Sequence, residues 1–195
     1  MHKTGMARRA RQAGGAAVEF ALVALFFLTF IFAILELARV EYLANTLMEV
    51  TRRAATDAAH ISFHDSAGLG RVRANAIFRD SAGPLALGDP VTDANVVIDY
   101  LALSRDTAAF RHVAALPACP ARNHWNCVAD PYADNCIRFV RARICASMDS
   151  AGNCQALPFQ RLFPFLDLSD SAMPIAETIV PAGSLGYVPG SMPCM

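Results

Sequence analysis

The six cysteines carry the most reactive side chains of this 195-residue chain, and all lie in its second half: Cys119, Cys127, Cys136, Cys145, Cys154 and Cys194. An even number of thiols in an oxidising compartment predicts up to three disulfides, without choosing among the possible pairings. The turn-forming residues between Cys145 and Cys154 favour that local pair. The alternative is a zinc site, because Cys119, His124 and Cys127 have one borderline ligand spacing, but the chain has no C-x-x-C pair.

No other residue set suits catalysis. The chain lacks the G-x-S-x-G, P-loop and H-E-x-x-H motifs. His60 and His64 are four residues apart, a spacing that can place two imidazoles on one helix face, but without a third ligand we interpret them as solvated residues at a fraying helix end. Asp130 and Asp134 flank a Pro-Tyr pair, which favours a turn over a carboxylate pair. We therefore expect no enzyme, cofactor or metal.

The charge is balanced overall but unevenly distributed. Lysine plus arginine and aspartate plus glutamate each total 17, which excludes a bulk basic nucleic-acid binder and an acidic disordered tail. Four basic residues and no acidic one lie in the first fourteen positions: Lys3, Arg8, Arg9 and Arg11. A hydrophobic fraction of 54% with only 17% charged residues predicts one embedded apolar segment.

That segment is Ala16–Leu35, in which every residue except Glu19 and Thr29 is apolar. As a helix it would span about 30 Å, the thickness of a hydrocarbon core, and the preceding basic residues predict a cytoplasmic N-terminus. The alternative is a cleaved secretory signal, but the run exceeds the usual h-region of about 7–15 residues. The nearest candidate cleavage site, at 36–38, has a glutamate where a small residue is needed.

The helical pattern continues beyond this segment through Glu36–Ala59, which has no proline or glycine. Apolar residues recur there every three or four positions and predict a stripe on one face: Leu37, Val40, Leu43, Leu47 and Val50. Charged residues fall mostly off this stripe, Glu36 among them. We expect one helix of more than about forty residues, apolar all round at first and amphipathic later.

Glu19 is the unusual residue of the apolar run. A carboxylate costs roughly 2.5–3.5 kcal/mol at mid-membrane and less near an interface. Glu19 lies only four residues into the run, so one interpretation is that it reaches interfacial water. However, Gly14 precedes it by five positions, Phe20 follows it directly, and the basic stretch ends just before.

This arrangement resembles the processing site of type IV prepilins, in which an inner-membrane aspartic peptidase cuts after a glycine and leaves glutamate as the fifth mature residue. More specifically, the AAVEFAL start and the Glu-Leu-Ala-Arg exit at 36–39 resemble the TadE-like segment of the tight-adherence (Flp) pilus system. Members commonly carry proline early in the run, where this chain has Leu25 and Phe26. The resemblance implies a cut between Gly14 and Gly15, and a Glu19 that meets the new N-terminal amine of a neighbouring subunit.

Beyond the helix, a short second helix is expected at Gly68–Arg79, and strands at Asn95–Leu103 and Cys136–Ala146. Arg138, Arg141 and Arg143 suggest an exposed strand face or edge guarded by charge, with an anion site as the alternative. Leu116–Pro131, which contains the single tryptophan Trp125, is expected to be a loop.

An apolar cluster follows, which we expect to dock on the sheet: Leu162, Phe163, Phe165, Leu166 and Leu168. Residues 171–179 are expected to add a short strand, and the glycine- and proline-rich end is expected to be coil.

The fold class is therefore α+β: a long transmembrane-to-amphipathic helix, then a small antiparallel sheet in a disulfide-containing periplasmic domain. We expect a basic leader at 1–14, a transmembrane helix at 15–35, a helical stalk at 36–80 and a head at 81–195.

The resemblance implies a minor pilin or pseudopilin anchored in the bacterial inner membrane, single-pass, with its C-terminal domain in the periplasm or in the pilus. Its partners would be the prepilin peptidase, other pilins and pilus assembly proteins, and no nucleic acid. The alternative is an uncleaved signal-anchor protein whose periplasmic domain binds a ligand or an envelope partner.

Overall fold

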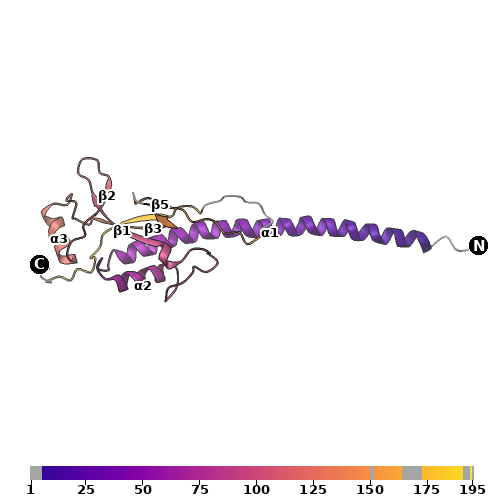
Figure 1. Ribbon diagram of the computed structural model, residues 1–195, viewed down its shortest axis with the longest axis horizontal. Helices are drawn as coiled ribbons and strands as arrows, with labels where there is room; N and C mark the ends of the chain where they lie inside the picture. Colours follow the sequence, from indigo (N-terminus) through magenta and orange to yellow (C-terminus); the bar gives the residue numbers. More distant parts are fainter. Residues whose placement is uncertain (1–5, 150–151, 164–172, 191–193, 195) are drawn as a thin grey trace, which may run out of the picture. The chain divides into compact units, whose positions relative to one another are not determined.

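The structure, a computed structural model, describes the backbone of residues 6–149, 152–163, 173–190 and 194, and side chains from residue 14 onward. The chain divides into two compact units, one of Met1–Tyr42 with Arg161–Leu168 and the other of Leu43–Gln160 with Ser169–Met195. Helix α1 (Met6–Ala58) runs through both (Figure 1). A long apolar helix, an antiparallel sheet and three disulfides confirm the α+β class.

The 53 residues of α1 confirm the continuous helix expected from a stretch without proline. Its buried stripe in the second unit is made of Leu43, Leu47, Val50, Ala54 and Ala58. The expectation was wrong at the start of the stripe, because Leu37 is 61% exposed and Glu36 is fully buried. Apolar spacing cannot separate a helix side that faces lipid from one that faces protein.

Helix α2 (Ser66–Ala76) begins where Asp65 accepts a hydrogen bond from the Gly68 backbone N–H at 2.8 Å. It ends near Phe78, whose φ of 62° is left-handed and cannot continue a helix. The predicted helix is confirmed, although it lies two or three residues earlier than expected.

The main sheet has the strand order β2-β1-β3-β6 and is antiparallel throughout. Its strands are β1 (Val96–Leu103), which follows the 3-10 turn η1 (Asp93–Asn95), β2 (Phe110–His112), β3 (Phe139–Ile144) and β6 (Glu177–Pro181). Both predicted central strands are confirmed, and β6 covers the end of the expected strand at 171–179. A separate hairpin pairs β4 (Ser147–Met148) with β5 (Cys154–Gln155).

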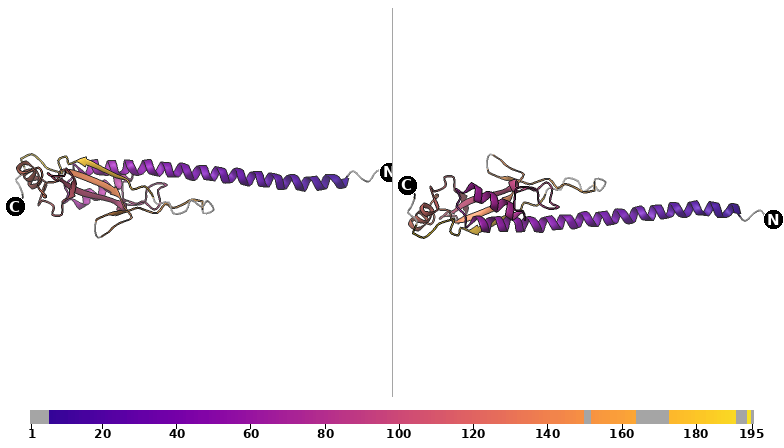
Figure 2. Two further views of the ribbon diagram at one scale, coloured as in Figure 1. Left: turned by 90° about the horizontal axis from the view of Figure 1, so that it is seen from above. Right: turned by 90° about the horizontal axis from the view of Figure 1, so that it is seen from below.

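One face of the main sheet packs on the part of α1 in the second unit and on α2 (Figure 2). Alternate residues of β3, namely Val140, Ala142 and Ile144, are buried in this core. Thr51 of α1 and Thr178 of β6 add a hydroxyl–hydroxyl hydrogen bond of 2.9 Å across the same layer. The core thus joins segments more than a hundred residues apart.

The expected loop at Leu116–Pro131 was wrong, since Pro120–Ala129 forms helix α3. Pro120 occupies the first helical turn, where its fixed φ and missing N–H are tolerated. Pro131 lies just beyond the last turn. The two prolines therefore bracket a helix, and the usual interpretation of proline as a loop residue obscured it.

The expected docking of the apolar cluster on the sheet was also wrong for the described residues. The ring of Phe163 lies 4.6 Å from the ring of Phe32 on α1, and both belong to the first unit. Phe165, Leu166 and Leu168 lie outside the described residues. The expected coil at the C-terminus is confirmed for residues 183–190.

Candidate functional site

The first unit presents an apolar helix surface with almost no protein cover. The part of α1 from Gly14 onward contains an 18-residue window of mean hydropathy 2.7, none of it buried, and is long and apolar enough to cross a membrane. Phe20 and Phe26 are 75% and 74% exposed. The Thr29 hydroxyl donates to the Leu25 carbonyl at 2.8 Å, which satisfies this polar group within the helix.

Glu19 is the polar group of this surface that the helix does not satisfy. Its side chain is exposed, and among the described side chains no cation lies within salt-bridge distance of it. A carboxylate on a lipid-facing helix is costly unless a partner neutralises it. In an apolar environment the Glu19 carboxylate would therefore need a cation from outside the described part of the chain.

Gly14 and Gly15 lie one turn before Glu19, and both are exposed. A Cβ added at either position would meet nothing within 4 Å. Each glycine in a helix costs about 1 kcal/mol relative to alanine, so α1 is locally easy to unwind at this pair. The peptide bond between them therefore lies in an exposed and weakly stabilised part of the helix.

Glu36 lies at the other end of the apolar run and is fully buried. Both of its carboxylate oxygens lie 3.3 Å from the Leu162 backbone nitrogen, which donates to them. The Arg39 Nη1 atom lies 3.8 Å from Glu36 Oε1. Glu36 could hardly be recognised as a site from the sequence. Its one sequence signal is its spacing, because it lies seven residues, or about two helical turns, before Leu43 of the buried stripe.

The comparison with known families now adds to this geometry. The model of a family described as TadE-like protein matches residues 14–56. Residues 14–56 are similar to the TadE-like family. Neither a curated protein nor a solved structure matches the chain. The family match confirms the resemblance to TadE-like proteins over this segment.

The TadE-like segment contains the features that stand out in the first unit. It begins at Gly14, and it includes Glu19, the exposed apolar surface and Glu36. It ends two residues before α1 does. The chemistry that the sequence predicted for residues 14–19 therefore falls within the matched region.

The cysteines of the second unit form three disulfides: Cys119–Cys194, Cys127–Cys136 and Cys145–Cys154. The last pair confirms the favoured local bridge, which cross-links the two sides of the β4–β5 hairpin. The zinc alternative was wrong, because Cys119 and Cys127 are both oxidised and have no thiolate to offer. Among the described residues, no group of three or more metal-ligating side chains could hold an ion.

His124, the third member of that rejected set, lies in an open pocket between α3 and the segment after β6. Its imidazole stacks on the Tyr187 ring at 4.9 Å with an interplanar angle of 11°. The pocket is lined by Arg138, Ser184 and the Cys127 end of a disulfide, among others.

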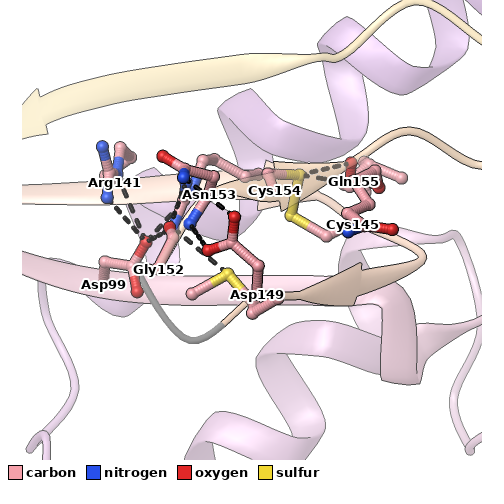
Figure 3. A network of polar contacts seen from close by, with 11 residues as sticks. Asp99, Arg141, Cys145, Asp149, Gly152, Asn153, Cys154 and Gln155 are labelled. Carbon is pink, nitrogen blue, oxygen red and sulfur yellow. Dashed lines mark hydrogen bonds and ion pairs between the residues drawn. A yellow bond between two sulfur atoms is a disulfide. The ribbon is translucent and has the colours of Figure 1, made fainter.

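The expectation that the arginines of β3 lie on an exposed strand face or edge was wrong. β3 is central in the sheet, and Arg143 and Asp99 are both buried. Arg141 and Arg143 both donate to Asp99 Oδ2, and Arg143 also donates to the Gly152 carbonyl at 3.3 Å (Figure 3). The alternative, an anion site, is not needed to explain this pair, because Asp99 is the anion.

The histidine pair and the aspartate pair have structural roles. α1 ends before His60, and His64 lies beyond the helix, where its Nε2 is 2.8 Å from the Pro117 carbonyl. The expectation that both imidazoles lie at a fraying helix end was therefore wrong for His64. Asp130 accepts the Tyr132 backbone N–H of the predicted turn, and this hydrogen bond lowers the pKa of the Asp130 carboxyl.

Proposed function

We propose that this chain is a membrane-anchored minor pilin or pseudopilin that takes part in assembly of a tight-adherence pilus. One observation carries the proposal. The TadE-like match starts at Gly14 and covers the apolar helix surface that the protein itself leaves exposed. A surface of this kind requires lipid or other apolar helices around it.

The mechanism is assembly without chemistry by this chain. A prepilin peptidase cuts between Gly14 and Gly15 and removes the basic leader, which creates a positively charged α-amine at Gly15. The apolar helix then passes from the bilayer into a bundle with other subunits. Glu19 of one subunit pairs there with the new amine of another, because a carboxylate in a dry helix bundle needs a cation.

The topology follows from the charge of the leader. A cytoplasmic N-terminus and a single span of the inner membrane place the second unit in the periplasm. The three disulfides support this location, because such bonds persist in oxidising compartments. The proposed partners are the prepilin peptidase, other pilins and pilus assembly proteins, and the protein acts as neither an enzyme nor a nucleic-acid binder.

N-terminal sequencing of the protein recovered from membranes of a host with the prepilin peptidase tests the proposal. We expect a start at Gly15 for the natural sequence and at Met1 for Gly14→Arg. Gly70→Arg is the matched control, because an added Cβ at Gly70 also meets nothing within 4 Å, and it should be cleaved normally. A start at Met1 in the natural protein would favour an uncleaved signal-anchor protein with a ligand-binding periplasmic domain. A start beyond residue 35 would mean that the helix serves only as a secretion signal.

A further inference from the structure

The segment around Leu162 and Phe163 lies against α1 at the end of the apolar run, although 126 residues separate Leu162 from Glu36. The Phe163 ring contacts the Phe32 ring with centroids 4.6 Å apart. Phe32 lies three residues before Leu35, which is about 4.5 Å along the helix axis. Phe163 therefore lies beside the apolar run itself and not beyond its end.

Glu36 holds this segment at that position along α1. The carboxylate is fully buried, and burial of a charged group is costly unless hydrogen bonds or an opposite charge compensate it. The Leu162 N–H and the Arg39 guanidinium both compensate it, at 3.3 Å and 3.8 Å. This backbone contact fixes the segment whatever its side chains are.

The side chains of the segment are apolar nonetheless. Leu162 is 56% exposed, although its backbone N–H donates a hydrogen bond to Glu36. Leu35, the last residue of the apolar run and the one before Glu36, is 51% exposed. An exposed apolar side chain of a second segment of chain thus lies at the level where the apolar run of α1 ends.

From this position we propose that Leu162 and Phe163 form a second membrane contact, inserted among the lipid acyl chains of the leaflet nearest Leu35. The inference goes beyond the pilin assignment but rests on its premise that α1 spans a bilayer. Lipid is the occupant that the geometry favours, because Phe163 packs beside Phe32 within the apolar run that the proposed function places in the bilayer. Withdrawal of α1 from the bilayer would then require withdrawal of Leu162 and Phe163 as well.

Tryptophan fluorescence of the full chain in phosphatidylcholine–phosphatidylglycerol vesicles tests this contact. Trp125 is the single tryptophan, so Trp125→Phe supplies a silent background. On that background, Leu162→Trp should lose emission when the lipids are brominated on their acyl chains. Val128→Trp is the matched control, because Val128 is similarly exposed but lies on α3 in the other unit, and its emission should not change.

Phe26→Trp separates the failure of this inference from the failure of the anchor. Quenching at position 26 without quenching at position 162 would overturn the second contact and leave the anchor intact. Absence of quenching at both positions would overturn the anchor, the pilin proposal and this inference together. Equal quenching at positions 162 and 128 would also overturn it, because the contact would not be specific to the segment.

The role of Glu36 is tested on the same reporter. Glu36→Ala removes the acceptor of the Leu162 N–H and should reduce the quenching at position 162. Glu36→Gln retains an acceptor oxygen and should preserve it. If the alanine variant retained full quenching, Glu36 would not be the residue that positions the segment.

Discussion

Arg143 of β3 donates from Nη2 to Asp99 Oδ2 of the neighbouring strand β1 at 2.6 Å, and both side chains are buried. The same carboxylate oxygen accepts two hydrogen bonds from Arg141, whose side chain is 21% exposed. One buried carboxylate therefore compensates two guanidinium groups. The loss of that carboxylate would leave both of them without compensation.

We predict that Asp99→Ala lowers the free energy of unfolding by about 3–5 kcal/mol, the usual cost of breaking a buried ion pair from one side. Arg141→Ala should cost only about 1 kcal/mol, because Asp99 keeps Arg143 and the lost group is partly solvated. Urea unfolding of the full chain in detergent micelles measures both values. Equal losses in the free energy of unfolding of the two variants would show that the buried Asp99–Arg143 pair stabilises the fold no more than the contact with Arg141 does.

The Tyr100 phenol provides a pH prediction, because burial raises its pKa to about 12. Below pH 10 the phenol is neutral in both states. Between about pH 10 and 12 the unfolded chain loses this proton while the folded chain keeps it, so stability should fall as the pH rises through that window.

Tyr100→Phe is the control for this slope. The Tyr100 hydroxyl is buried without a hydrogen-bond partner among the described residues, so its removal should leave stability at neutral pH within about 1 kcal/mol of the natural value, or slightly higher. Urea midpoints at neutral pH and at pH 11 check both statements. A slope that persisted unchanged in the phenylalanine variant would assign it to other groups.

The disulfides should differ in their contribution to stability according to the length of chain that they close. Cys119–Cys194 closes a separation of 75 residues, whereas Cys127–Cys136 and Cys145–Cys154 each close 9. Loop-closure entropy predicts a loss of about 4 kcal/mol for the double alanine variant of the long pair and about 2.5 kcal/mol for either short pair. Thermal unfolding of the three double variants gives the order, and a larger loss at a short pair would contradict it.

Glu19→Ala should leave cleavage after Gly14 intact and prevent assembly. Removal of one member of a buried ion pair costs several kcal/mol, so co-isolation with partner subunits should fall by at least about 100-fold. Glu41→Ala, an exposed glutamate on the same helix beyond the apolar run, is the matched control and should assemble normally. Full assembly of the Glu19 variant would remove the ion pair from the mechanism.

Most of the secondary structure could be predicted from the sequence. The long apolar helix and the strands β1 and β3 follow from local patterns of side-chain type, which act over a few residues. Helix α3 could also have been found, because Pro120 is placed as a first-turn proline and a second proline follows the helix. The error there came from assigning both prolines to a loop.

The candidate site likewise has some features that local sequence predicts and others that only the tertiary structure shows. The features at Gly14 and Glu19 lie within six residues of one another, so the sequence by itself determined them, together with the apolar helix and the TadE-like character of its start. Only the tertiary structure decided the burial of Glu36 against Leu162, the Asp99–Arg143 pair and the Cys119–Cys194 bridge. Each of these depends on chain closure over more than forty residues, and local spacing carries no information about which distant group will meet a buried charge or thiol.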